Sequence, residues 1–142
     1  MKALVDTCVI IDLLQKRKPF FKDAHLTFLV AAGNQFDGAI SAKSITDIYY
    51  LMHRFFHDDA KARKVLETLF KLFSVLDTTE LDCKKALLSP MSDYEDALMT
   101  ETAQRAGMDC IITRNIKDYT KSSIQIYSPS DFLTLLNEAE KE

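Results

Sequence analysis

The feature that most constrains the fold is a repeated alternation of short apolar segments with longer segments of helical periodicity. Five short runs have the apolar character of buried strands: 2–6, 36–41, 74–76, 110–113 and 124–127. Segments between them space apolar side chains three and four residues apart, which predicts helices over 7–15, 20–32, 43–57, 58–73, 79–88, 93–106 and 128–138. Strands that alternate with helices predict an α/β fold, a three-layer sandwich with a parallel sheet covered on both faces.

Composition and size narrow the class of protein. The chain has 142 residues, which fits one domain over 1–142, and its three glycines and three prolines predict short loops. A net charge of −3 excludes a uniformly basic surface of the kind that holds nucleic acid non-specifically. No apolar run approaches the length of a membrane span. The three widely spaced cysteines form no C-x-x-C pair, so we expect reduced thiols and a cytoplasmic protein.

Acidic residues recur where the predicted strands end. Asp6 ends the first strand, Asp118 follows the fourth, and Asp47 lies early in the helix after the second. Asp93 and Asp96 share a face at the start of the helix before the fourth strand, for which Ser92 is the expected N-cap. Functional groups of an open parallel sheet gather beyond the carboxyl ends of its strands, so the pattern predicts a cleft of three to five carboxylates.

Such a cleft indicates a bound divalent cation. Crowded carboxylates repel one another unless a cation neutralises them, and oxygen ligands without a Cys/His set suit Mg²⁺ or Mn²⁺. Either ion would serve hydrolysis of a phosphodiester. Basic residues near the predicted strand ends are available for backbone phosphates: Lys16, Arg17, Lys18, Lys43, Arg114 and Lys121.

Each acid also has a purely structural interpretation. Asp6 is suited to cap the following helix, and Asp47 to a solvated helix face. Asp93 and Asp96 are favoured in a first turn by the helix dipole alone, while Asp118 is suited to a turn. Residue type alone therefore leaves both a structural and a metal-binding role open for each acid. The prediction of a metal site depends on the acids lying close together.

Four segments together resemble the PIN domain family, in particular its small prokaryotic members, the toxin ribonucleases of toxin–antitoxin pairs. The segments run from Val5 to Leu14, Ser41 to Ile48, Asp93 to Leu98 and Ile111 to Tyr119. The resemblance covers nearly the whole chain in order and spacing. It implies a five-stranded parallel sheet of order 3-2-1-4-5, in which the first and fourth strands lie side by side.

The resemblance also implies a role for each acid. Asp6 would be the central metal ligand and Asp96 the helix acid that faces it. Asp47 stands where the family usually has Glu, so its shorter side chain would reach the metal through a water. Asn115 takes the place of the family's fourth acid, and Asp118 or Asp93 would supply the missing carboxylate, with Asp118 preferred because it lies on the loop after the fourth strand.

The implied activity is a Mg²⁺- or Mn²⁺-dependent endoribonuclease that leaves 5′-phosphate and 3′-hydroxyl ends. Thr7 and Thr113 would be supporting hydroxyls that hold a carboxylate or a water, and Arg17, Lys43 and Arg114 would contact RNA. The implied partners are RNA, a cognate antitoxin and a second copy of the chain in a homodimer.

Two other classes of function remain open. One is a PIN-like module that binds RNA or a protein without cleaving, its site weakened by Asn115 and Asp47. The other is a receiver-like or phosphatase-like domain that uses Asp6 as a nucleophile. His53 and His57 have a spacing that suits zinc, but no third ligand is evident and a solvated helix end explains them.

Overall fold

A computed structural model, which describes residues 1–141, shows a five-stranded, entirely parallel sheet. The strand order is β3-β2-β1-β4-β5, as predicted, so β1 and β4 are neighbours at the point where the order reverses. The strands are β1 (Lys2–Val5), β2 (Asp37–Ser41), β3 (Ser74–Leu76), β4 (Cys110–Ile112) and β5 (Gln125–Tyr127).

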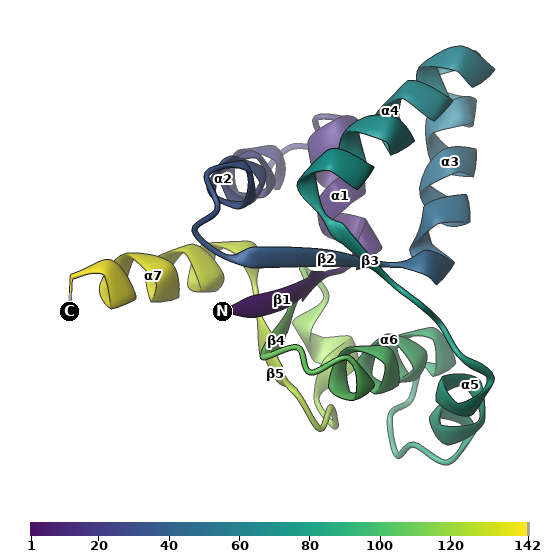
Figure 1. Ribbon diagram of the computed structural model, residues 1–142, viewed down its shortest axis with the longest axis vertical. Helices are drawn as coiled ribbons and strands as arrows, with labels where there is room; N and C mark the ends of the chain where they lie inside the picture. Colours follow the sequence, from purple (N-terminus) through teal and green to yellow (C-terminus); the bar gives the residue numbers. More distant parts are fainter. Residues whose placement is uncertain (142) are drawn as a thin grey trace.

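Helices cover both faces of this sheet (Figure 1). One face carries α1 (Thr7–Leu14), α2 (Phe21–Ala32), α3 (Ala42–Phe56) and α4 (Asp59–Leu72). The other carries α5 (Glu80–Leu87) and α6 (Tyr94–Arg105), and α7 (Pro129–Glu140) packs against α2 and β5. The predicted three-layer α/β class is therefore confirmed. No helix within residues 1–141 is long and apolar enough to cross a membrane.

Alternate residues of β1 build the two halves of the core. Ala3 and Val5 pack into the cluster beneath α1 to α4, which also contains Ile10, Ile48 and Phe132. The side chain of Leu4 faces the other way and packs with a second cluster beneath α6, made of Ala39, Met99, Ala103, Ile111 and Tyr119. A strand buried on both faces explains why residues 3–5 are continuously apolar rather than alternating.

Strand register fixes the position of the candidate site. Val5 of β1 pairs with Ile112 of β4, and the backbone N–H of Asp6 donates to the carbonyl of Ile112 at 2.9 Å. The next residues along each strand, Asp6 and Thr113, therefore emerge side by side at the carboxyl edge of the sheet. This edge is where a doubly wound sheet carries its functional groups.

Helix boundaries agree with the sequence patterns to within about two residues, with one correction to a cap. Asp93, not Ser92, is the N-cap of α6, and its carboxylate accepts a hydrogen bond from the Asp96 backbone N–H at 2.9 Å. Asp93 has the extended backbone (φ −107°, ψ 125°) that lets a capping carboxylate reach the third residue of the helix.

A short 3₁₀ helix, Ile116–Tyr119, follows β4, and no pattern in the sequence predicted it.

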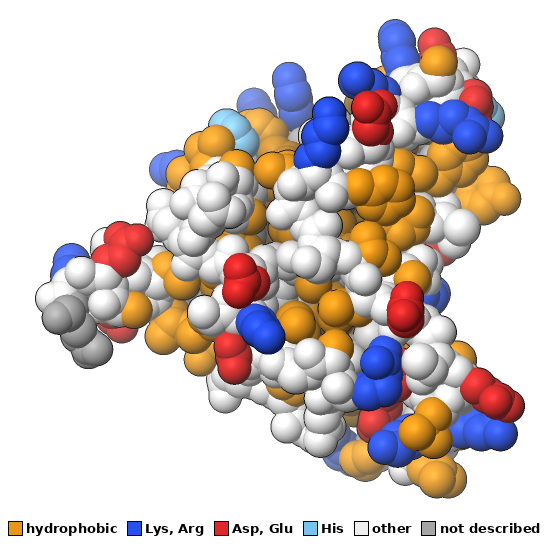
Figure 2. All heavy atoms as spheres, in the orientation of Figure 1, with side chains coloured by type: hydrophobic (Ala, Val, Ile, Leu, Met, Phe, Trp, Pro, Cys, Tyr) orange, Lys and Arg blue, Asp and Glu red, His pale blue; other side chains and the backbone are white. Residues whose placement is uncertain are grey.

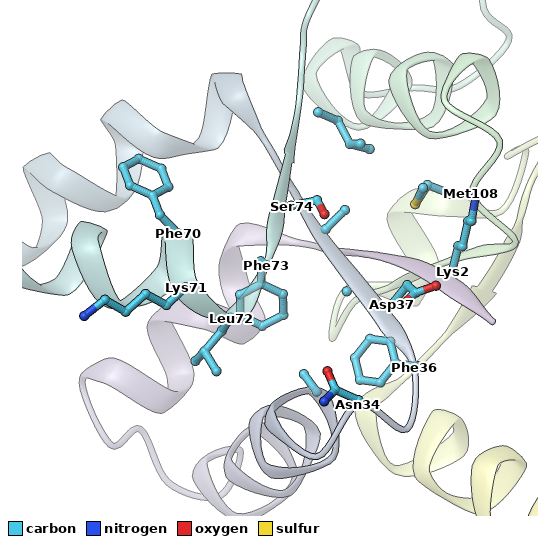
Figure 3. A pocket seen from close by; sticks show the side chains of 14 residues that line it. Lys2, Asn34, Phe36, Asp37, Phe70, Lys71, Leu72, Phe73, Ser74 and Met108 are labelled. Carbon is cyan, nitrogen blue, oxygen red and sulfur yellow. The ribbon is translucent and has the colours of Figure 1, made fainter.

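One recess lies at the opposite end of the sheet from the acids. It has a volume of about 450 Å³ and is lined by the amino ends of the strands, including Lys2, Asp37 and Ser74. Figure 3 shows the rings of Phe36 and Phe73 within it, and these rings pack over Gly38. Two more open hollows, of about 400 Å³ and 390 Å³, lie at the acid-bearing edge. The face shown in Figure 2 carries charged side chains of both signs.

Candidate active site

Asp6 occupies the centre of the carboxyl edge and serves two purposes there. It is the N-cap of α1, and its Oδ1 accepts a hydrogen bond from the Thr7 backbone N–H at 2.8 Å. Its side chain is buried, with an exposed fraction of 9% for the residue. The structural interpretation of this acid as a helix cap is therefore correct, and it does not compete with a functional role.

The second oxygen of Asp6 is surrounded by hydrogen-bond donors. Asp6 Oδ2 accepts from the hydroxyl of Thr113 at 2.8 Å and from the hydroxyl of Tyr119 at 3.3 Å. The thiol of Cys8 lies 3.7 Å from the same oxygen. These donors favour the ionised carboxylate and lower its pKa, but burial is the larger effect, and the pKa of Asp6 is raised overall.

Asp96 is the carboxylate that faces Asp6. It lies in the first turn of α6 and is half-buried. Burial, followed by the negative charges of Asp6 and Asp93, raises the pKa of Asp96 to about 7, and a hydrogen bond from Tyr119 counters this only in part. Two carboxyl groups that are close together and shielded from water resist simultaneous ionisation, and a bound cation would favour the charged form of both.

Asp47 is held by a basic residue of its own helix. Lys43 Nζ lies 2.7 Å from Asp47 Oδ2 and 2.5 Å from Glu95 Oε1, so one ammonium group links α3 to the first turn of α6. Asp47 lines an open hollow of about 400 Å³ together with Thr7, Lys43 and Glu95. In this arrangement the carboxylate of Asp47 contacts Lys43 rather than joining the pair formed by Asp6 and Asp96.

The remaining predicted acids lie around Asp96 rather than on Asp6. Asp118 is exposed in the 3₁₀ helix after β4, and its charge adds to the rise in the pKa of Asp96. Asp93 acts on Asp96 in the same way from the N-cap position. Asn115 is exposed, and its backbone N–H donates to the hydroxyl of Thr113 at 3.0 Å.

The two predicted supporting threonines differ in what their hydroxyls do. The hydroxyl of Thr113 donates directly to Asp6, and that residue is completely buried. The hydroxyl of Thr7 donates instead to Ser44 Oγ at 2.8 Å, and only the backbone of Thr7 reaches Asp6. Thr7 thus ties α1 to α3 beside the site.

The three predicted RNA-contacting residues have different partners. Arg114 forms an ion pair with the buried Asp12, with distances of 2.7 Å and 3.2 Å, and its guanidinium lies 4.3 Å from the centre of the Phe20 ring. Lys43 is bound to its two carboxylates, as described above. Arg17 is exposed and its Nε donates to Gln15 at 3.1 Å.

Sequence reasoning missed two residues that shape this site. Tyr119 belongs to the segment Ile111–Tyr119, but an aromatic residue after a strand is ordinarily taken as core. Asp12 lies in the second turn of an apolar helix, and a lone acid after Val9, Ile10 and Ile11 was the available signal for a buried ion pair. Its partner, Arg114, is 102 positions away, so no local pattern identifies it.

The acid pair suits a hydrated divalent cation. Asp6 and Asp96 offer only oxygen ligands in a negative, largely buried setting, which matches Mg²⁺ or Mn²⁺. Among residues 1–141, no three His, Cys, Asp or Glu side chains come together as a ready ligand set. The arrangement therefore fits an ion that keeps several of its waters, as Mg²⁺ does, better than a fully protein-coordinated one.

A parallel sheet with an acid pair at the reversal of its strand order is typical of a doubly wound α/β protein, and comparison with known proteins identifies the family. The family model described as "PIN domain" matches residues 2–117. The chain belongs to the PIN domain family. Among curated proteins, no match is found.

Solved structures share the fold at low sequence identity. A toxin–antitoxin complex from Klebsiella pneumoniae aligns with a TM-score of 0.66 and 23% identity, over 89% of this chain and 97% of that chain. VapBC from Salmonella typhimurium, crystallised with DNA, aligns with a TM-score of 0.65 and 17% identity over 91% and 98%. The Mycobacterium tuberculosis toxin VapC20, described as cleaving the sarcin–ricin loop, aligns at 0.64 and 14% over 87% and 98%.

Proposed function

We propose that this protein is a Mg²⁺- or Mn²⁺-dependent endoribonuclease and the toxin of a toxin–antitoxin pair. The observation that supports the activity best is the opposed pair of Asp6 and Asp96 at the junction of β1 and β4, where burial and mutual repulsion raise the pKa of Asp96 to about 7. A divalent cation would relieve this repulsion. Membership of the PIN domain family and the toxin neighbours support RNA as the substrate.

In this proposal Asp6 and Asp96 hold the metal, and Asp47 and Asp118 complete its surroundings through bound water. When bound, the ion supplies an activated water and neutralises charge on the scissile phosphate. Thr113 and the backbone N–H of Thr7 keep the Asp6 carboxylate oriented before any ion binds. Arg17, Lys43 and Arg114 remain the proposed contacts to backbone phosphates, and Arg17 is the most exposed of them.

The decisive experiment measures cleavage of single-stranded RNA by the purified chain with Mn²⁺, with Mg²⁺ and with excess EDTA. Asp6→Asn and Asp96→Asn each should lower the rate about a hundredfold or more, since each removes a ligand of the ion. Asp37→Asn is the matched control, because Asp37 is an exposed acid at the opposite end of the sheet. Equal cleavage in EDTA, or full activity of Asp6→Asn, would refute the proposal.

A second candidate function is a PIN-like module that binds RNA or a protein without cleaving it. The observation that favours it is the state of Asp47, which is bound by Lys43, together with the neutral Asn115 in place of an acid. Titration with Mn²⁺ separates the two functions. An enzyme binds Mn²⁺ at millimolar concentration or below, whereas a degraded site does not, and RNA binding without turnover would then favour the module.

An antitoxin partner is supported by an apolar groove between α1, α2 and α4. The groove has a volume of about 400 Å³, and Leu29 on its wall is 53% exposed. It is lined mainly by Leu13, Leu14, Phe28, Leu29, Val65, Leu69 and Leu72. Several similar structures are toxin–antitoxin complexes. We therefore propose that a protein antitoxin packs an apolar segment here, so Leu29→Lys should escape inhibition by the antitoxin while it still cleaves RNA.

A homodimer is proposed on the basis of exposed aromatic side chains of α3. Tyr50 is 67% exposed and Phe55 is 51% exposed, more than a solvated helix face requires. Light scattering on the purified chain should give twice the monomer mass, and Tyr50→Ser combined with Phe55→Ser should shift it to the monomer value. A wild-type chain that is monomeric at high concentration would remove this part of the proposal.

A further inference from the structure

Tyr119 places its hydroxyl between the two carboxylates of the candidate site. The residue is 2% exposed and comes from the 3₁₀ helix after β4. Its hydroxyl donates to Asp6 Oδ2 at 3.3 Å, and it lies close enough to the carboxyl group of Asp96 to lower the pKa of that group.

The position of this hydroxyl is determined by the packing of its ring. The ring belongs to the cluster of Leu4, Ala39, Met99, Ala103 and Ile111, beneath α6. Met99 lies one turn after Asp96 on α6, and Leu4 lies two residues before Asp6 on β1. The same packing thus anchors the ring to both elements that carry the acids.

A buried hydroxyl needs a hydrogen-bond partner, and here the partner is the carboxyl group of Asp6. Hydrogen bonds to ionised groups are stronger than those between neutral groups, so the hydroxyl restrains the carboxylate that it contacts. In the loop after β4, the second residue after Thr113 is Asn115, which is neutral and exposed, so no acid stands at that position. Tyr119 therefore adds a second hydroxyl from this loop to the acid pair, beside that of Thr113.

We propose that Tyr119 is a positioning residue, whose hydroxyl donates to Asp6 and holds that carboxylate in place beside Asp96, so that the two acids together accept a divalent cation. This inference rests on the proposed function and adds to it a residue that acts through the two acids. Groups that orient metal ligands typically contribute a factor of about 10 to 100 in metal affinity. Tyr119 provides no ligand itself.

The test compares Tyr119→Phe with Tyr127→Phe. The first substitution keeps the packed ring and removes only the hydroxyl, and the second removes a tyrosine hydroxyl from β5, where the ring packs on Phe132. Titration with Mn²⁺ in the absence of RNA should show about a tenfold or greater loss of affinity for Tyr119→Phe. Tyr127→Phe should stay within about twofold of the wild type.

A metal-independent measurement keeps this inference separate from the proposed function. The ¹³Cγ resonances of Asp6 and Asp96, recorded in EDTA, should shift in Tyr119→Phe and remain in place in Tyr127→Phe. Two results would overturn the role of Tyr119. One is that the resonances of Tyr119→Phe match those of the wild type; the other is that the wild type binds Mn²⁺ and Tyr119→Phe binds it equally well. Shifted resonances in a protein that never binds Mn²⁺ would instead support the positioning contact and refute the nuclease.

Discussion

Asp96 on α6 lies opposite Asp6 at the end of β1, and the burial of Asp96, together with the charge of Asp6, raises the pKa of Asp96 from 3.8 to about 7. The two residues are 90 positions apart in the sequence, and each is also placed by a helix terminus. A fold that brings two such groups together opposes their simultaneous ionisation. A divalent cation bound there, as proposed, would remove this repulsion.

This repulsion predicts a characteristic pH dependence of stability in EDTA. The folded protein holds the Asp96 proton more tightly than the unfolded chain does, so the free energy of unfolding falls as pH rises from about 4 to about 7 and then levels off. Asp96→Asn removes this loss. The melting temperature of Asp96→Asn minus that of the wild type should therefore be a few degrees larger at pH 8 than at pH 4.

The measurement is thermal unfolding of both proteins across that pH range, with Asp37→Asn as the control. The difference for Asp37→Asn should stay nearly constant, because that exposed acid lies at the other end of the sheet. A constant difference for Asp96→Asn as well would contradict the assigned repulsion.

Lys43 should act in opposite directions on metal and on RNA. Its ammonium group neutralises Asp47 and Glu95 at the mouth of the site, so Lys43→Met should strengthen Mn²⁺ binding by about twofold to fivefold, the range of half-exposed ion pairs. The same substitution should raise KM for RNA, since a phosphate contact is lost. Lys64→Met, on the outer surface of α4, should change neither quantity. Weaker Mn²⁺ binding by Lys43→Met than by the wild type would contradict this prediction.

The ion pair of Arg114 with Asp12 should be a major determinant of stability. The Asp12 side chain is 2% exposed, and Arg114→Ala would leave its carboxylate buried without its partner, at a cost of about 3 kcal/mol or more. Urea unfolding gives this value directly. Arg63→Ala, which breaks the exposed pair with Asp59, should cost less than about 1 kcal/mol. Similar losses of unfolding free energy in the two variants would contradict the stabilising role of the Arg114–Asp12 pair.

Gly38 should tolerate no side chain. A Cβ at this position of β2 would lie 2.7 Å from the Phe73 ring and 3.2 Å from the Phe36 ring, the two rings seen in Figure 3. Gly38→Ala should therefore lower stability by about 1–3 kcal/mol through overpacking. Gly33→Ala, whose nearest contact would be 3.4 Å, is the control and should change stability far less. Equal melting temperatures of the two variants would contradict this account.

The sequence by itself determined the order of strands and helices and the location of acids at strand ends. Those features are local: apolar spacing distinguishes a strand such as residues 110–112 from a helix such as α3, and a residue that follows a strand emerges at its carboxyl edge. The PIN domain resemblance supplied the sheet order, and with it the neighbouring placement of Asp6 and Thr113.

Only the tertiary structure decided which side chains contact each other at that edge. Tyr119 reaches Asp6 across 113 positions, and Arg114 takes Asp12 as its partner across 102. Lys43 pairs with an acid on its own helix and with Glu95, because the beginnings of α3 and α6 come close together at the carboxyl edge of the sheet. Such choices depend on distances of a few ångströms between separate elements, and those distances follow from core packing rather than from any local pattern.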